Sequence, residues 1–191
     1  MDILSDEEIK LLHSPAIFQA KRSLEKKLIS VLESASGRLE TAYAGNDSPF
    51  PPEVLAVAPK ISRGENYLGY PWMILDHPRF FTREDVFAVR SFVWWTQGAS
   101  FTLQLSGKYL EEFLPALINN ADKLELSGLY SGINDDPWIH HFGEDNYREI
   151  IDANHLMNEE ENIRRRGYLK LMRRHSLEHI EQIPDLVCEF A

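Results

Sequence analysis

The chain has 191 residues, of which 43% are hydrophobic and 26% are charged, a composition typical of a folded globular protein. Thirty acidic against twenty basic residues give a formal net charge of −10, which disfavours binding to nucleic acid or to anionic membranes. The one cysteine, Cys188, excludes an intramolecular disulfide, and the acidic start lacks the pattern of a signal peptide. We therefore expect one globular domain over residues 1–191, located in the cytoplasm, with no nucleic-acid or membrane partner.

Two helices are predicted at the beginning of the chain. Ser5 and Glu8 have the spacing of a capping box, which predicts a short helix that ends near Ser14-Pro15. Apolar residues then recur at spacings of three and four over residues 15–35, with charged residues on the other faces, and Gly37 is expected to break this second helix. The pattern favours an amphipathic helix that covers a sheet.

A loop and two strands are predicted next. The loop covers residues 44–52, which are rich in Gly, Asn, Asp, Ser and Pro, and the strands cover residues 54–61 and 67–75. The tripeptide Asp76-His77-Pro78 is a turn signal. The aromatic residues Tyr67, Tyr70 and Trp72 lie near Lys60 and Arg63 in the sequence, so they could stack on a peptide or a ring-shaped ligand or simply pack within the sheet.

The segment 87–105 is predicted to be a β-hairpin, around which the rest of the sheet is built. The tripeptide Thr96-Gln97-Gly98 fits a three-residue loop whose first two residues form a type I turn and whose glycine takes the left-handed position. This loop places Trp95 opposite Ala99. Because side chains alternate between the two faces of a strand, the loop assigns every residue of the hairpin to one face or the other.

One face of the predicted hairpin is almost wholly apolar and should lie on the core. Its pairs are Val93 with Phe101, Ser91 with Leu103, and Val89 with Leu105. The other face mixes aromatic and polar groups, and its pairs are Trp94 with Ser100, Phe92 with Thr102, and Arg90 with Gln104. A hairpin loop of two or four residues would instead bring another set into the core, namely Phe92, Trp94, Phe101 and Leu103.

The mixed face is the candidate binding site. An arginine among aromatic rings is costly to desolvate unless a carboxylate or an anionic ligand pairs with it. On a solvent-facing strand surface, Arg90 would keep its head in water or pair with Asp76 or Glu84. Alternatively, the face is one wall of a pocket in which Arg90 and Gln104 orient a planar or acidic ligand. The predicted ligand-binding residues are Arg90, Phe92, Trp94, Gln104 and Trp72.

The remainder of the chain is predicted to be mainly helical. An apolar stripe over residues 109–118 indicates a helix, residues 124–130 suggest a strand, and the C-terminal third is expected to be helical from about Asn146. Four basic residues would then share one face of the last helix, as a solvated surface or an anion site: Arg166, Lys170, Arg173 and Arg174.

Histidines suggest a second kind of site. His175 and His179 lie one turn apart on the predicted C-terminal helix, so both imidazoles could reach one zinc ion. A third ligand could come from Asp152, His155, His140 or Asp185. The segment departs from the metalloprotease pattern, in which Glu directly follows the first His, because Glu178 stands beside the second. A metal-dependent hydrolase using His175, His179 and His155 is the alternative hypothesis.

The sequence therefore predicts an α+β fold in which an antiparallel sheet, built on the central hairpin 87–105, packs against the N-terminal and C-terminal helices. The leading functional hypothesis is a binding module for a small-molecule or protein ligand, with no cofactor. Neither the identity of the ligand nor the oligomeric state follows from the sequence, and a homo-oligomer is left open.

Overall fold

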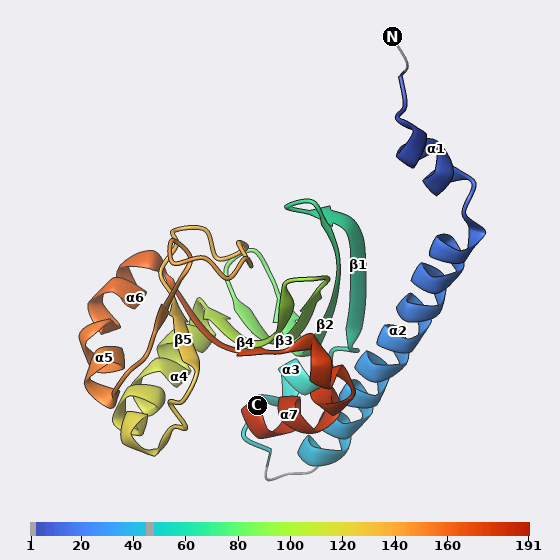
Figure 1. Cartoon of the computed structure of the whole chain (residues 1–191). Helices are drawn as coiled ribbons and strands as arrows, with labels where there is room; N and C mark the ends of the chain where they lie inside the picture. Colours follow the sequence, from blue (N-terminus) through green and yellow to red (C-terminus); the bar gives the residue numbers. More distant parts are fainter. Residues whose placement is uncertain (1–2, 45–47) are drawn as a thin grey trace.

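The computed structural model describes residues 3–44 and 48–191, and at its centre is an antiparallel sheet of seven strands (Figure 1). The strands are β1 (Lys60–Tyr67), β2 (Tyr70–Phe81), β3 (Val86–Trp94), β4 (Gly98–Ser106), β5 (Leu129–Gly132), β6 (Tyr147–Glu149) and β7 (Tyr168–His175). Their order across the sheet is β1-β2-β3-β4-β7-β5-β6. The predicted α+β class and the antiparallel sheet around the hairpin are confirmed.

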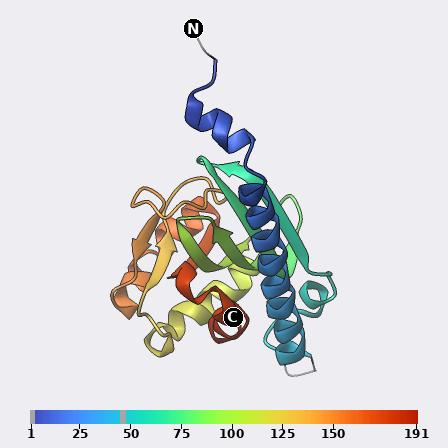
Figure 2. The same ribbon diagram turned by 45° about the vertical axis from the view of Figure 1, so that its right-hand side comes forward.

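Helices lie on one side of this sheet and at one of its ends (Figure 1). They are α1 (Asp6–Leu12), α2 (Pro15–Tyr43), α3 (Pro52–Leu55), α4 (Lys108–Asn119), α5 (Ala153–Asn158), α6 (Glu160–Arg166) and α7 (Ile183–Phe190), with the 3-10 segments η1 (Ala121–Lys123) and η2 (Leu177–Gln182). Figure 2 shows α2 running alongside the β1 edge of the sheet. Among the residues that the structure describes, no helix combines the length and the apolar character that a bilayer crossing needs.

The two predicted N-terminal helices are present, and one is longer than expected. The Ser5 hydroxyl accepts a hydrogen bond from the backbone N–H of Glu8, and the Glu8 carboxylate accepts one from the N–H of Ser5, which is the predicted capping box. Helix α2 has 29 residues and passes through Gly37 without ending there. A glycine inside a helix costs only about 1 kcal/mol, and the buried residues around Gly37 outweigh that cost: Leu32, Ala35 and Leu39.

The hairpin has the predicted faces but not the predicted pairs. Val93 lies opposite Ala99 and Arg90 lies opposite Thr102, each two residues away from the predicted partner. The loop consists of residues 95–97, one position earlier than expected, and Gly98 already belongs to β4. A shift of two residues keeps the alternation of side chains, so the division into an apolar and a mixed face survives the error.

The strands before the hairpin differ more from the prediction. Residues 54–61, predicted as a strand, contain the end of α3 and only the start of β1. The predicted turn at Asp76-His77-Pro78 lies inside β2, where the register with β3 shifts between Asp76 and Arg79. A proline is tolerated at such a bulge because no ladder hydrogen bond is required of it there. The strand therefore continues for 12 residues instead of turning.

The C-terminal third is not helical throughout, which corrects the prediction from Asn146 onward. The predicted basic helix face does not exist, because Arg166 ends α6 whereas Lys170, Arg173 and Arg174 belong to β7. Strand β7 lies between β4 and β5 in the sheet. Its alternation sends Leu169 and Leu171 to the main core and turns Lys170 to the opposite face.

The two faces of the sheet are covered in different ways. On the face called here the helix face, apolar residues of α2, α4 and α7 pack on those of the strands to form the main core, which includes Leu32, Leu39, Leu75, Val93, Phe101, Leu105, Tyr109 and Val187. The opposite face, called here the cleft face, carries a smaller buried cluster made of Ile74, Phe92 and Trp94. The cleft face is covered in part by the segment 133–146, which joins β5 to β6. The space between this segment and the sheet contains the candidate site described below.

Candidate functional site

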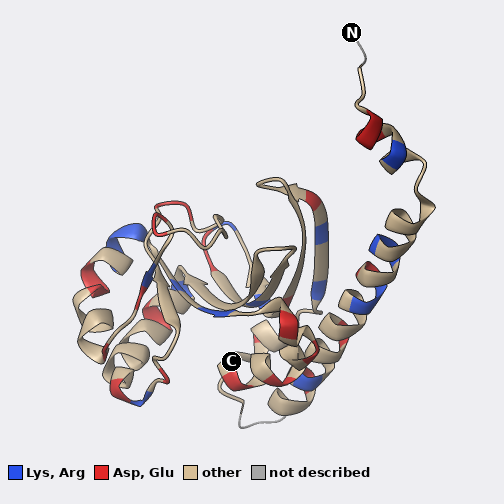
Figure 3. Ribbon diagram, viewed as in Figure 1, with Lys and Arg blue, Asp and Glu red and all other residues tan. Residues whose placement is uncertain are grey.

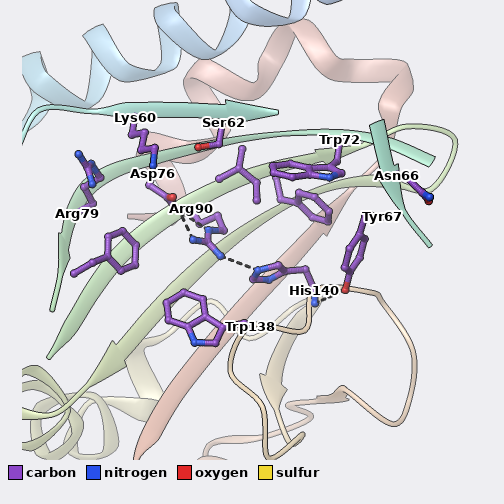
Figure 4. A pocket seen from close by; sticks show the side chains of 13 residues that line it. Lys60, Ser62, Asn66, Tyr67, Trp72, Asp76, Arg79, Arg90, Trp138 and His140 are labelled. Carbon is purple, nitrogen blue, oxygen red and sulfur yellow. Dashed lines mark hydrogen bonds and ion pairs between the residues drawn. The ribbon is translucent and has the colours of Figure 1, made fainter. Parts of the chain in front are cut away.

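A cleft of about 700 Å³ opens on the cleft face of the sheet, between strands β1 to β3 and the segment 133–146 (Figure 4). Side chains from all four elements line it: Lys60 and Tyr67 of β1, Trp72 and Arg79 of β2, Arg90 and Phe92 of β3, and Trp138 and His140 of the segment. The volume lies within the range of roughly 300–1,000 Å³ that is typical of small-molecule sites.

Aromatic side chains form one end of the cleft. Tyr67 packs edge-on against Phe92 and Trp94, with ring centroids 6.1 Å and 5.2 Å away. The Tyr67 hydroxyl also accepts hydrogen bonds from the backbone N–H groups of His140 and His141, at 2.8 Å and 3.1 Å. Tyr67 therefore joins the aromatic cluster of the sheet to the segment that covers it.

A buried ion pair crosses the floor of the cleft. The Arg90 guanidinium donates from Nε to Asp76 Oδ1 at 2.6 Å and from Nη2 to Asp76 Oδ2 at 3.2 Å. Both side chains are more than nine-tenths buried. This pairing is one of the two that the sequence suggested for Arg90, but both side chains are buried and do not form part of an exposed strand surface. Because a buried charge is costly without its partner, the pair fixes the position of the guanidinium.

His140 accepts the next hydrogen bond in the chain of polar groups. Arg90 Nη1 lies 2.8 Å from His140 Nε2, and since a guanidinium can only donate, Nε2 must be the unprotonated ring nitrogen (Figure 4). Burial, together with the charges of Lys170 and Arg90, lowers the pKa of His140 to about 2. The ring is therefore neutral and carries its proton on Nδ1.

Lys170 is the last member of this series of hydrogen-bonded groups, and it lies beneath the segment 133–146. Its Nζ lies 3.3 Å from His140 Nδ1 and also donates to the carbonyl oxygens of Pro137 and Ile139. Burial, followed by the nearby charge of Arg90, lowers the pKa of Lys170 to about 7, with Asp136 acting in the opposite sense. A neutral amine has two N–H groups for the two carbonyls and one lone pair for the His140 Nδ1–H. Each N–H donor of the Lys170 amine and of the His140 ring then meets an acceptor.

The other end of the cleft is cationic. Lys60 is exposed, and Arg79 is half-buried with its Nε donating to the carbonyl oxygen of Ala58 at 2.8 Å. In contrast to Arg90, neither side chain forms an ion pair with a carboxylate among the described residues. Three cationic side chains thus line the cleft against one carboxylate, that of Asp76, in a chain whose net charge is −10.

The predicted ligand-binding residues are divided between the cleft and its surroundings. Arg90, Phe92 and Trp72 line the cleft, as the pocket hypothesis requires. Trp94 lies behind the lining in the buried aromatic cluster, where its Nε1 donates to the carbonyl oxygen of Tyr67 at 3.1 Å. Gln104 is buried between Ala88 and Lys170 in the sheet and does not line the cleft.

Sequence reasoning did not place several of the lining residues at this site, among them Arg79, Trp138 and His140. Arg79 reaches the cleft because of the bulge in β2 between Asp76 and Arg79. The sequence predicted a turn at this position, so Arg79 was not assigned to a face of the strand. Trp138 and His140 come from a segment about fifty residues further along the chain, and no local pattern reports that it folds over β3. His140 was considered only as a zinc ligand, although the adjacent pair His140-His141 shows that one of the two must face inward from an extended chain.

The geometric premise of the zinc hypothesis is wrong. His175 is the last residue of β7, and His179 has non-helical backbone angles within η2, so the two imidazoles do not share a helix face. His155 is in α5, which packs near α4 at the other end of the sheet. In the described part of the chain, no three His, Cys, Asp or Glu side chains are grouped closely enough to hold a metal ion.

No family model matches this chain. Neither a curated protein nor a solved structure matches it. Any functional assignment therefore depends on the chemistry of the cleft itself.

Proposed function

We propose that the chain is a binding module whose cleft takes a small anionic molecule with a flat, apolar body. The observation that carries this proposal is the meeting of two features in one cleft of about 700 Å³: free cations at one end and aromatic side chains along its length. Lys60 and Arg79 supply the positive charge, while Trp72 and Trp138 supply apolar surface.

The cationic side chains of the cleft differ in whether a carboxylate already neutralises them. Arg90 is already neutralised by Asp76 and oriented by His140, so its role is to hold the floor of the cleft in place. Lys60 and Arg79 have no such carboxylate among the described residues. An anionic group bound between them would gain attraction from a cationic pocket in a protein that otherwise repels anions.

The exposure of Trp138 supports an apolar ligand body. Trp138 is 48% exposed at the rim of the cleft, with the Phe81 ring 6.0 Å away and the Arg90 guanidinium 5.8 Å from its ring centroid. A ring-shaped ligand that entered the cleft would cover this indole and remove apolar surface from water.

A matched pair of fluorescent probes tests the proposal. The dye 8-anilinonaphthalene-1-sulfonate carries a sulfonate, whereas N-phenyl-1-naphthylamine has the same ring system without it. We expect the sulfonate dye to bind at one site per chain and at least about tenfold more tightly than the neutral dye, which corresponds to about 1.4 kcal/mol. Trp138→Ala should weaken both dyes, because it removes surface that both rings cover.

The charged residues provide the decisive variants. Lys60→Ala and Arg79→Ala should each weaken the sulfonate dye and leave the neutral dye unchanged, whereas Arg165→Ala, an exposed arginine on α6, should change neither. Far-ultraviolet circular dichroism of each variant checks that the fold is intact. Equal affinity for both dyes, or sulfonate binding that survives both cleft substitutions, would reject the cleft as an anion site.

A further inference from the structure

The strand pairing sets the distance between the two ends of the cleft. Three rows of paired residues cross β1, β2 and β3 on the cleft face. The first row contains Lys60, Asp76 and Arg90, the second contains Ser62, Ile74 and Phe92, and the third contains Gly64, Trp72 and Trp94. Because each residue of a strand advances by about 3.3 Å, the third row lies about 13 Å from the first.

Charge distinguishes the two ends of the cleft. Lys60 and Arg79 lie at the cationic end, whereas Tyr67 and Trp72 lie at the opposite end, called here the neutral end (Figure 4). Residues 66–72, which form the tip of the β1–β2 hairpin, include no charged residue, as Figure 3 shows. An anionic group is therefore attracted to the cationic end, and the neutral end suits an uncharged group.

Trp72 forms a flat platform at the neutral end. Its indole lies over Gly64 of β1, so closely that a Cβ atom on Gly64 would be 2.5 Å from Trp72 Nε1. Only a glycine leaves room for the ring at this position. One face of the indole is therefore turned to the strand, and the other is turned to the cleft that Trp72 lines. A planar group of a ligand can stack on this second face.

Hydrogen-bond donors at the neutral end lack acceptors. The Tyr67 hydroxyl oxygen accepts from two backbone N–H groups of the segment 133–146, so its own O–H is left to donate. Asn66 Oδ1 accepts from the N–H of Gly69 at 2.9 Å, which leaves the amide N–H groups of Asn66. Within the described part of the chain, no residue accepts a hydrogen bond from these groups or from Trp72 Nε1. The neutral end therefore suits a ligand group that accepts hydrogen bonds.

We propose that the ligand of the cleft is elongated, with an anionic group at the cationic end and a planar, acceptor-bearing group about 13 Å away on Trp72. This inference rests on the proposed function, because it takes the cationic end as the anion site. The middle row of the sheet supplies Ile74 and Phe92, which also line the cleft. A narrow apolar chain that joins the two ends of the ligand is buried against these side chains.

Three dansyl probes test the spacing. In 8-(dansylamino)octanoic acid, the long probe, an extended chain holds the carboxylate about 12 Å from the sulfonyl oxygens, which accept hydrogen bonds. Dansylglycine has the same ring and carboxylate without the long chain, and N-octyl dansylamide has the ring and the chain without the carboxylate. We expect the long probe to bind at least about tenfold more tightly than either of the others in a fluorescence titration.

Variants at the neutral end test where the ring lies. Trp72→Ala should weaken the long probe at least about tenfold, and Gly64→Ala should also weaken it, because the new Cβ displaces the indole. Dansylglycine is too short to reach Trp72 from the cationic end, so both variants should leave its affinity unchanged. Tyr70→Ala is the matched control, since Tyr70 is an aromatic residue of β2 that does not line the cleft, and it should change neither affinity. Circular dichroism verifies the fold of each variant.

The outcomes separate this inference from the proposed function. A long probe that binds no more tightly than dansylglycine, or that is unaffected by both Trp72→Ala and Gly64→Ala, would overturn the elongated ligand and leave the anion site intact. In Lys60→Ala/Arg79→Ala, the long probe should bind no more tightly than N-octyl dansylamide. A carboxylate advantage that survives this double substitution would overturn both proposals, because the anion would then lie elsewhere.

Discussion

Strands β3 and β4 have two buried faces that are built on different physical principles. On the helix face, Val93, Phe101 and Leu105 are covered by apolar residues of helices, so burial of apolar surface is the main stabilising term. On the cleft face, Arg90 is covered by the segment 133–146 and held by a chain of hydrogen bonds from Asp76 to Lys170. The stability of the helix face depends on how completely its apolar side chains fill the space between sheet and helices. The stability of the cleft face depends on each buried polar group keeping its hydrogen-bond partner.

This difference explains why the cleft of about 700 Å³ lies on the cleft face, whereas pockets on the helix face are smaller, at about 170 to 260 Å³. Helices that pack on a sheet through apolar side chains leave little space between the two layers. A covering segment that is held at a few polar points, such as Tyr67 and Lys170, can leave open space beside those points. We therefore expect the two faces to respond differently to substitution, to pH and to loss of single hydrogen bonds.

The largest effect is expected for the buried ion pair. Asp76→Ala leaves the Arg90 guanidinium buried without a carboxylate and should lower the free energy of unfolding by about 3–5 kcal/mol. Urea denaturation measures this change. The double variant Asp76→Ala/Arg90→Met should recover most of the loss, because no charge then remains buried. Phe101→Ala on the helix face should be as costly, at about 3–5 kcal/mol, and Arg90→Met should not rescue it. A double variant that is less stable than Asp76→Ala would contradict this account.

The second effect is a pH dependence that belongs to Lys170. Its pKa falls from the ordinary value of 10.5 to about 7 in the folded chain. Between these two values the unfolded chain binds a proton that the folded chain does not, so this lysine makes stability rise as pH increases from about 7 to about 10.5. The slope of this contribution is at most about 1.4 kcal/mol per pH unit.

Lys170→Met isolates this contribution. The difference in free energy of unfolding between wild type and Lys170→Met should grow in favour of wild type over that pH window. Other lysines cancel in the difference, because both chains contain them. A difference that stays constant from pH 7 to pH 10 would show that Lys170 is charged in the folded protein and would exclude the proton arrangement described for His140.

A smaller effect is expected where the sheet holds the covering segment. Tyr67→Phe removes the hydroxyl oxygen that accepts hydrogen bonds from the N–H groups of His140 and His141. Because the segment is partly exposed, water can replace part of this interaction, and we expect a loss of about 1 kcal/mol. Amide hydrogen exchange should become faster at these two positions, whereas exchange in β4 should be unchanged. Uniform acceleration through the sheet would argue against a local tether.

The smallest effect is predicted on the helix face. The Ser91 hydroxyl is buried and has no hydrogen-bond partner among the described residues. Ser91→Ala removes this unsatisfied group and changes the volume of the core very little. The free energy of unfolding should therefore stay the same or rise by up to about 1 kcal/mol. A clear loss of stability in thermal denaturation would mean that the hydroxyl has a partner.

The sequence predicted the features that follow from local periodicity. The faces of the hairpin were right because alternation is insensitive to an error of two residues, although Val93 pairs with Ala99 and not with Phe101. The capping box of α1 was right because Ser5 and Glu8 satisfy each other within one turn. Residues 168–172 belong to β7, although the sequence was predicted to be helical from about Asn146.

Features that depend on distant contacts could not be predicted. The bulge of β2 brings Arg79 into the cleft, and Trp138 and His140 arrive from a segment with no regular structure. Which cations are free to bind a ligand follows only from knowing that Asp76 pairs with Arg90 and that neither Lys60 nor Arg79 forms an ion pair within residues 3–44 and 48–191. Sequence patterns therefore indicated that a site could lie on this face, but not which of its charges are available to a ligand.

The most direct test of the account is the ratio of affinities for the two naphthalene dyes, compared between wild type and the variant Lys60→Ala/Arg79→Ala. Equilibrium fluorescence titration provides both affinities. We predict that the preference for the sulfonate dye, at least about tenfold in wild type, is lost in the variant, so that both dyes bind with about equal affinity. The affinity for the neutral dye should stay the same. A preference that persists in the variant would contradict the assignment of the cleft as an anion-binding site.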